Sequence, residues 1–262
     1  MSARVISSSS PTSVASTNPF SGKQMFVEAT EVGDELEMTR ADMDRWALRS
    51  HERAVSATDE GRLPEEIVPV TIASKKGETV VEVDEGPRRD TSLEKLASLP
   101  GLAGKEGSHT AGNSPGVNDG AGALVLASDE WAKSNGRRAL ATIVTHAQVA
   151  DDFAYLARTP ANAAKKALEK AGLKAEEIDL WEINEAFASV ALNSIRMLGI
   201  DEDRVNVNGG AVALGHPIGA SGARILGSLV LELRRRGGGL GCAAICSGGG
   251  QGDAVIVEVN GG

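Results

Sequence analysis

Apolar residues recur at regular intervals along most of the chain after residue 30. Met43, Trp46, Ala47 and Ala54 follow a capping Thr39 at helical spacing. β-branched runs on the two sides of Gly77 favour a hairpin, and Pro100 ends a short amphipathic stretch. The elements predicted up to residue 127 are a helix over 40–58, hairpin strands over 67–72 and 79–83, a short helix over 93–99 and a buried strand over 123–127.

From Leu140 onward, strand-like and helix-like stretches alternate. The predicted order is a strand over 141–147, a helix over 159–171, a strand over 178–183, a helix over 185–197, a strand over 205–207, a helix over 219–235 and strands over 240–246 and 254–259. The last two strands are joined only by Ser247–Asp253, which requires antiparallel pairing because a parallel return needs a longer crossover. We therefore expect an α/β fold, with a mixed sheet covered by helices on both faces.

The N-terminal segment differs from the rest of the chain in composition. Residues 1–30 are rich in serine, show no apolar period and contain no acidic residue before Glu28, which predicts a disordered tail. A transit peptide shares this Ser-rich, acid-poor composition, although only Arg4 and Lys23 supply positive charge. A misassigned or truncated start explains the composition at least as well.

Composition and charge narrow the class of protein. The 262 residues include 27 Lys+Arg and 36 Asp+Glu, a formal net charge of −9, which argues against nucleic-acid binding by a broad basic surface. Two cysteines are too few for a disulfide scaffold and favour a reducing compartment. Because no run approaches the ~20 apolar residues of a membrane span and no secretory signal is visible, we expect a cytoplasmic protein, with an organellar matrix as the alternative.

Three glycine-bounded segments follow predicted strands, where ligands of open α/β sheets bind. They contain Asn184 at a strand-to-helix junction, His216 between Gly215 and a proline, and Cys246 at the end of a buried strand. The glycines after Cys246 offer successive N–H groups that could form an anion-binding nest. An Asn, a His and a Cys in such places suggest thiolate chemistry with a backbone oxyanion hole.

Each signal also has a plainer explanation. Asn184 could simply be the N-cap of the following helix. A phosphate loop around His216 is disfavoured because no Gly-Lys-Ser/Thr follows. Cys242, in the middle of its strand, is expected to be an inert core thiol, and the spacing of the two cysteines does not support a zinc site.

Taken together, the three segments closely resemble the thiolase family, the acyl-CoA acetyltransferases. The motifs are NEAF at Asn184–Phe187, GHPIGASG at Gly215–Gly222 and CSGGG at Cys246–Gly250, in the family's order and near its usual spacing. The resemblance extends to Thr110–Asn113, Asn118–Ala121 and the helix that contains Trp46–His51. It covers everything beyond about residue 30.

The resemblance implies a fold of two similar α/β halves with a loop domain that covers CoA. On this basis we expect a small α/β loop domain over residues 31–118, a remnant of the N-terminal half over 119–136 and a C-terminal domain over 137–262, after the tail at 1–30.

The resemblance also implies a role for each site residue. His216 would activate a nucleophilic cysteine and line an oxyanion hole, and Asn184 would hold the water that completes this hole. Cys246 would be the acid/base for the second substrate, and the Gly248 N–H would help to form the other oxyanion hole.

CoA contacts are implied for three further residues. Ser114 precedes Pro115, which stands where many family members have a CoA-contacting Ser. Arg88 and Arg89 could meet CoA phosphates, and a solvated basic turn is the alternative. A CoA thioester would be the substrate, with no covalently bound cofactor and no metal.

One departure from the family concerns the reaction itself. The family's nucleophilic cysteine lies in the first half, and this chain has no cysteine before Cys242. We therefore expect an acyltransferase that condenses acetyl-CoA or cleaves 3-ketoacyl-CoA, inactive as this chain alone. The alternative is a non-catalytic CoA-binding or subunit-interaction protein. The expected partners are CoA and either another copy or another thiolase chain, but neither nucleic acid nor a membrane.

Overall fold

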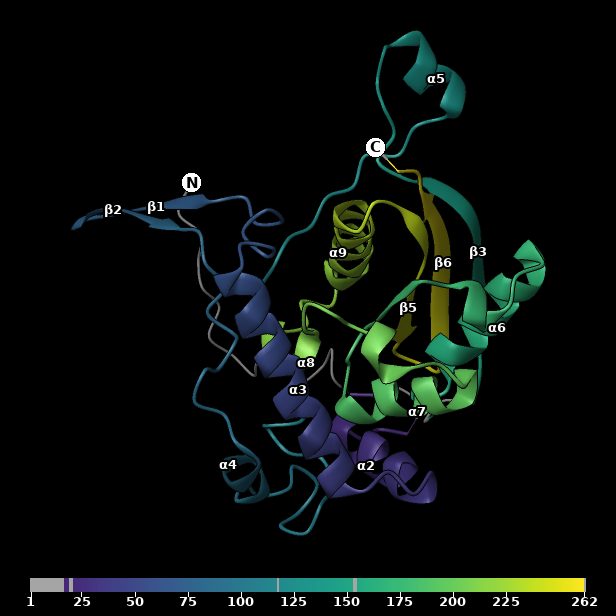
Figure 1. The fold of residues 1–262 in the computed structure, drawn as a ribbon. Coiled ribbons are helices and arrows are strands. Elements are labelled where there is room, and N and C mark those ends of the chain that lie inside the picture. The colour runs from purple at the N-terminus through teal and green to yellow at the C-terminus, as the bar shows by residue number, and fades with distance from the viewer. Residues whose placement is uncertain (1–16, 19–20, 117, 153–154, 262) are drawn as a thin grey trace.

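The computed structural model describes residues 17, 18, 21–116, 118–152 and 155–261 (Figure 1). The helices are α2 Met25–Glu35, α3 Arg40–Asp59, α4 Leu93–Ala97, α5 Asp129–Ser134, α6 Thr159–Ala171, α7 Ala188–Leu198, α8 Ala211–Leu214 and α9 Ser221–Arg235, with 3₁₀ turns η1 Ala175–Glu177 and η2 Glu202–Arg204. The strands are β1 Val70–Ser74, β2 Gly77–Val81, β3 Thr142–Ala150, β4 Leu180–Ile183, β5 Gly239–Ser247 and β6 Gln251–Val259.

A mixed four-stranded sheet organises the second half of the chain. Its strand order is β3-β6-β5-β4, in which β4 and β5 are parallel and the other pairs are antiparallel. β5 and β6 pair from Ser247 with Gln251 outward, which confirms the antiparallel pairing predicted from their short link. The parallel β4–β5 pair brings the carboxyl ends of two neighbouring strands to one edge.

Helices cover both faces of this sheet, as predicted (Figure 1). On one face, α6 and α7 pack through small residues such as Ala164 and Ala191 around Trp181 of β4. On the other face, α9 contributes the apolar stripe Ile225, Leu229 and Leu233. The spacing of four residues within this stripe explains why one side of the helix is buried.

The predicted helix over 40–58 is confirmed as α3. The Thr39 hydroxyl accepts the Asp42 N–H at 3.1 Å and so caps the helix at the expected residue. Met43 and Trp46 are fully buried and join the core cluster that includes residues of α7. Through these residues, α3 connects the first part of the chain to the sheet domain.

The hairpin of β1 and β2 projects from the rest of the molecule (Figure 1). Its strands are exposed along their whole length, and they begin at Val70 rather than at the predicted Ile67. The predicted short helix is confirmed as α4, capped by the Ser92 hydroxyl.

Three predicted elements differ in the structure. Residues 123–127 form no strand, and Val125 and Leu126 are 91% and 72% exposed, because no described strand lies beside them to complete a ladder. Residues 205–207 form only one bridge, between Val205 and Trp181. The helix predicted from Glu185 begins at Ala188, because residues 184 and 185 belong to no regular element and residues 186 and 187 form a bend.

Helix α2 corrects part of the predicted disordered tail. Residues 1–16 and 19–20 of that tail lie outside the described residues, whereas residues 25–30 are helical. Met25, Ala29, Val32 and Leu36 recur at intervals of four, three and four, which is a helical period. Val32 is buried in a cluster with Cys246, so this apolar stripe has a partner.

No helix among the described residues has the length and apolar character that crossing a membrane requires.

Close packing between β6 and α6 generates the first testable prediction. A Cβ added at Gly252 would lie 2.5 Å from the Thr159 carbonyl oxygen. Gly252→Ala should therefore lower the free energy of unfolding by about 1–3 kcal/mol. Gly227→Ala on α9 is the matched control, because the nearest atom would be 3.9 Å away; it should stabilise by about 0.5–1 kcal/mol. Equal effects of both variants in urea denaturation would contradict this packing.

Candidate functional site

The carboxyl ends of β4 and β5 place two predicted site residues at the same edge of the sheet. The Asn184 N–H donates to the Ala244 carbonyl at 2.9 Å, immediately after Ile183 pairs with Ala244. Cys246 lies two residues after Ala244 on β5. Because the strands are parallel here, residues far apart in the sequence leave the sheet side by side.

Asn184 is not the N-cap of α7. That position belongs to Phe187, which makes no side-chain capping bond. Instead, the Asn184 amide Nδ2 lies 3.4 Å from His216 Nε2. Its other side-chain atom, Oδ1, is buried and has no hydrogen-bond partner among the described residues. Asn184 thus offers one unused acceptor beside the imidazole.

His216 is held in one orientation by a chain of hydrogen bonds. The Ser221 hydroxyl donates to the Pro217 carbonyl at 3.0 Å, so its oxygen is free to accept from His216 Nδ1 at 2.6 Å. This assigns the ring proton to Nδ1, and Nε2 carries the lone pair that faces the Asn184 amide. A neutral imidazole in this tautomer can accept a proton at Nε2.

The backbone before His216 is shaped by close contact with Asn118. Gly215 has φ 89°, and a Cβ there would lie 2.5 Å from the Asn118 side chain. The Asn118 carboxamide oxygen also accepts the His216 N–H at 3.3 Å. Burial, together with the charge of Arg224, lowers the pKa of His216 to about 4, so the ring is uncharged near neutral pH.

Cys246 is a buried thiol rather than a thiolate in this structure. The residue is 7% exposed and packs in a cluster with Val32, Ala186 and Val190. Burial raises the pKa of Cys246 to about 12, which overrides the help expected from the adjacent glycines. The pKa of Cys242, which is completely buried in the core, is also raised by burial.

The three predicted CoA contacts lie in different surroundings. Ser114 is buried, and its hydroxyl has no hydrogen-bond partner among the described residues. The neighbouring Asn113 accepts, with its carbonyl, the Ala188 N–H at the start of α7 at 3.0 Å. Arg88 is exposed, and its N–H donates to His51 Nδ1 at 3.1 Å. Arg89 already forms a bidentate ion pair with Asp59, at 2.5 and 2.8 Å.

Glu185 is a site-supporting residue that the sequence reasoning missed. Its fully buried carboxyl group accepts four hydrogen bonds, with donor-to-oxygen distances of 2.8–2.9 Å. The donors are Trp46 Nε1 and the Ser50 hydroxyl of α3, Asn206 Nδ2 and the Val212 N–H of α8. The available signal was an acidic residue that directly precedes the apolar run Ala186–Ala188.

Gly210 and Asn206 are closely packed around Glu185. A Cβ on Gly210 would overlap the Glu185 carboxyl group, and the Gly210 N–H donates to the Ser50 hydroxyl at 3.0 Å. Asn206, with φ 47°, bonds both the N–H and the carbonyl of Ile183. Glu185 therefore joins α3, the end of β4 and the segment that leads to His216.

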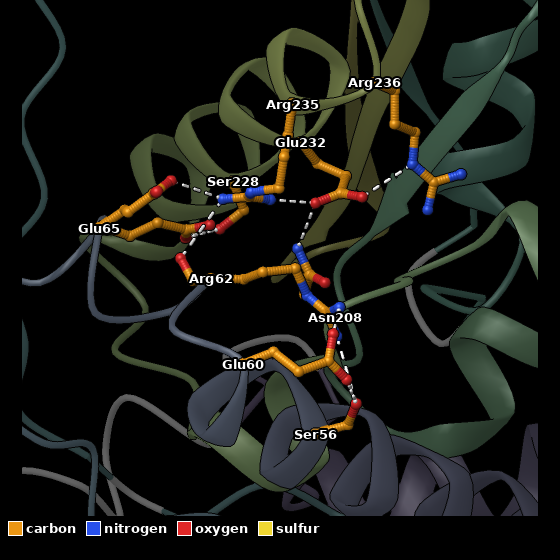
Figure 2. Close-up of polar contacts among 10 residues, drawn as sticks. Ser56, Glu60, Arg62, Glu65, Asn208, Ser228, Glu232, Arg235 and Arg236 are labelled. Carbon is orange, nitrogen blue, oxygen red and sulfur yellow. Dashed lines mark hydrogen bonds and ion pairs between the residues drawn. The ribbon is translucent and has the colours of Figure 1, made fainter.

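An ion-pair network fastens the same segment to α9 (Figure 2). The buried Glu232 carboxyl accepts Asn208 Nδ2 at 3.0 Å and also binds Arg235 and Arg236. Arg235 reaches Glu65 at 2.9 Å, beyond the end of α3. Figure 2 shows this network lying between α9 and the chain that follows α3.

His109 forms a second buried polar centre near the site. Its Nε2 lies 2.8 Å from the Ser189 hydroxyl of α7, and its Nδ1 lies 3.3 Å from the Thr30 hydroxyl of α2. The ring also meets Phe187 edge-on at 5.2 Å. Burial lowers the pKa of His109 to about 4. This residue holds α2 against α7, next to the cluster that covers Cys246.

Comparison with protein-family models covers both parts of the chain. A model described as "Thiolase, C-terminal domain" matches residues 137–259, and one described as "Thiolase, N-terminal domain" matches residues 7–130. Among curated proteins, an acetyl-CoA acetyltransferase of Syntrophomonas wolfei is 45% identical over 92% of this chain and 61% of its own length. A mitochondrial 3-ketoacyl-CoA thiolase of Bos taurus is 44% identical over 89% of this chain and 59% of its own length.

Solved structures give the same picture. The acetyl-CoA acetyltransferase of Bacillus anthracis has a TM-score of 0.93 and 42% identity, over 98% of this chain and 66% of that one. Human mitochondrial 3-ketoacyl-CoA thiolase in complex with CoA has a TM-score of 0.89 and 42% identity, over 95% of this chain and 62% of that one. The chain spans about three fifths of the length of the curated relatives it matches.

The four bonds to Glu185 generate the second prediction. Glu185→Gln places an amide N–H₂ among donors, so the variant should lose roughly 2–4 kcal/mol of unfolding free energy. Glu202→Gln is the control, because its ion pair with Arg45 is half exposed and should contribute less than about 1 kcal/mol. Urea denaturation measures both, and a Glu185→Gln variant as stable as the control would contradict the supporting role.

The lowered pKa of His109 generates the third prediction. In the unfolded chain this histidine takes up a proton near pH 6.5, whereas in the fold it stays neutral down to about pH 4. Its stabilising contribution is therefore present above about pH 6.5 and is lost as the pH falls toward 4. When the pH is lowered from 7.5 to 5, the unfolding free energy of His109→Gln should fall by roughly 1–2 kcal/mol less than that of the unsubstituted chain. His146→Gln, at an exposed site, is the control; identical pH slopes for both variants would refute the prediction.

Proposed function

The chain belongs to the thiolase family, and we propose that it supplies the C-terminal catalytic residues and the CoA-covering loop of an acyltransferase that acts on acyl-CoA thioesters. The observation that carries this proposal is the Asn184–His216 pair. The neutral imidazole presents Nε2 next to the Asn184 amide, whose buried Oδ1 accepts no hydrogen bond from any described residue.

His216 is proposed to take the proton of a nucleophilic cysteine at Nε2. The Ser221 bond at Nδ1 supports this role, because it holds the ring in the tautomer whose Nε2 carries the lone pair that can accept a proton. The thiolate attacks the thioester carbonyl, the acyl group forms a bond to the cysteine sulfur, and CoA leaves as its thiol after receiving a proton. Asn184 is proposed to hold, through Oδ1, a water whose other hydrogen stabilises the oxyanion.

Cys246 is proposed as the acid/base for the second substrate. In the condensation direction, its thiolate removes a proton from the methyl group of acetyl-CoA, and the resulting carbanion attacks the acyl-cysteine. The new carbon–carbon bond forms as the carbon–sulfur bond breaks. The Gly248 N–H is proposed to stabilise the enolate oxygen. Thiolysis of a 3-ketoacyl-CoA is the same sequence reversed.

The high pKa of Cys246 has a consequence for this role. At neutral pH the buried group is a protonated acid, able to donate to a departing carbanion, and it becomes a base only when a bound substrate or a charged neighbour favours the thiolate. The role of proton donor in thiolysis therefore needs no change of the resting state.

Ser114 is the best supported of the three proposed CoA contacts. Its buried hydroxyl is close in sequence to the carbonyl that bonds the start of α7, and it has no hydrogen-bond partner in the part of the chain that the structure describes. Of the two arginines, Arg88 has no side-chain ion pair among the described residues, whereas Arg89 would have to leave Asp59 to bind a CoA phosphate. No cofactor besides the CoA thioester substrate is required by this scheme.

The part of a thiolase that this chain does not match, about two fifths of the curated relatives' length, is proposed to cover the open apolar surface beside α9. This surface is a shallow depression lined by Leu124, Ala223, Leu226, Ala243, Ile245 and Val255. The exposed Val125 and Leu126 continue it, and exposed apolar patches of this kind mark association surfaces. The covering part, with its cysteine, would come from another thiolase chain or from a further segment of the same protein.

We keep the domain division proposed from the sequence: a loop domain over 31–118, a remnant over 119–136 and a C-terminal domain over 137–262. Two free cysteines fit a reducing compartment, for which we propose the cytoplasm or an organellar matrix. The second candidate function is CoA binding without catalysis by these 262 residues, which contain no cysteine before Cys242.

The fourth prediction is that the purified 262-residue chain does not catalyse thiolysis of acetoacetyl-CoA. Acyl transfer needs an activated nucleophile, and if Cys246 were acylated, no base would remain for the second step. Addition of an N-terminal thiolase segment with its cysteine should restore CoA-dependent cleavage. In that complex, His216→Ala should lower the rate at least ~10²-fold, while His146→Gln should not.

Two results would overturn the proposed function. Turnover by the chain alone, abolished by Cys246→Ser, would make Cys246 the nucleophile. If this chain forms a stable complex with an N-terminal thiolase segment that carries its cysteine, and the complex binds CoA but shows no cleavage, the non-catalytic alternative is favoured.

A further inference from the structure

Arg224 lies one turn into α9, the helix whose first residue binds His216. It follows Ser221 by three residues, so the two side chains share one face of the helix. Ser221 bonds His216 Nδ1, which brings the imidazole to the same end of α9 as Arg224. All three nitrogens of the Arg224 guanidinium group are buried, and none has a hydrogen-bond partner among the described residues.

Two carboxyl groups, the buried one of Glu182 and the half-buried one of Glu66, accompany Arg224 without cancelling its charge. Glu182 is 4% exposed, and on β4 it shares with Leu180 the face that packs against α9. Glu66 follows α3 and bonds the Ser228 hydroxyl of α9. Burial raises the pKa of both groups, so each carries less negative charge at a given pH than an exposed carboxylate would.

The groups that face His216 from the elements around it are mostly uncharged. Asn184 approaches from the turn after β4, Asn118 from the segment before α5, and Ser221 from α9. Among the described residues, Arg224 is the one charged group whose field changes the pKa of His216, and it acts in the same direction as burial. A buried charge acts strongly on its neighbours because little water screens it.

We propose that Arg224 is a positioning residue for His216, and that its buried charge adds to the effect of burial in keeping the imidazole uncharged, the state in which Nε2 takes up a proton. The consequence for catalysis rests on the proposed function. In a completed site, the cysteine and His216 would rest as thiol and neutral imidazole rather than as an ion pair. The proton would then move only as the thioester carbonyl is attacked.

The test is a pH titration of the histidine ring signals by NMR, on the 262-residue chain. The chain has only 4 histidines, and His216→Gln assigns the signal of interest. Arg224→Met removes the charge and keeps most of the volume, whereas Arg224→Lys keeps the charge. Arg234→Met, at an exposed position near the other end of the same helix, is the matched control.

Arg224→Met should move the His216 midpoint upward by about half a pH unit or more. Arg224→Lys and Arg234→Met should leave it close to the wild-type value. Unchanged ring signals of His51 and His109 in Arg224→Met would show that the fold is intact. If this variant does not fold, Arg224→Gln, which retains N–H donors, is titrated instead and should give the same upward shift.

An unchanged midpoint in the folded neutral variant would overturn the proposal, and so would an equal shift in Arg224→Lys, which would assign the effect to shape rather than charge. In the complex with an N-terminal segment, the acid limb of kcat/KM should move with the NMR midpoint. Because the titration needs no activity, an inactive complex with a normal NMR result would count against the proposed function alone.

Discussion

The buried carboxyl group of Glu185 is the interaction on which the geometry of the site depends. It accepts hydrogen bonds from α3, from Asn206 and from the backbone of α8, and so it connects three segments at a single point. Glu185 directly follows Asn184 in the sequence, and α8 ends two residues before His216. The carboxyl group therefore sets the positions of both members of the Asn184–His216 pair through the backbone that carries them.

This arrangement places a carboxyl group in the interior, where a charged group that loses its water costs the most free energy. A buried carboxyl group is tolerated when donors fill its lone pairs, and removal of one partner leaves the others unsatisfied. The same reasoning applies to His109, whose two ring nitrogens meet hydroxyl groups of α2 and α7. The two centres tie α3 and α2 to the sheet domain with directional bonds, which specify one docking geometry better than apolar contacts do.

The site itself follows a different electrostatic principle. His216 and Cys246 are both neutral at rest, because burial disfavours their charged forms. Charge would then appear only during a reaction, next to the dipoles of Asn184 and the glycine turn. The apolar surface beside α9 ends close to this site, since Gly122 approaches Ala223 and Arg224 while Leu124 lines the depression. A partner on that surface would lie along the helix that carries Ser221 and Arg224.

Local patterns account for most of the elements and for the choice of candidate site residues. The periods of α3, α6 and α9 match the faces they bury, and the short link after Cys246 decides the direction of β6. The motifs alone single out Asn184, His216 and Cys246. These features could be predicted because they depend on residues a few positions apart, through helical spacing, capping and turn length.

The tertiary structure decided what depends on distant partners. Residues 123–127 have the composition of a strand but no ladder, because a strand needs a neighbour that no described segment provides. Asn184 turns toward His216 instead of capping α7, and Glu185 bonds residues up to 139 positions away. The protonation of His216 and Cys246 likewise follows from burial. By itself the sequence determined which groups are available, and only the fold decided which of them meet and in which charge state, because desolvation and hydrogen bonding are properties of the packed chain.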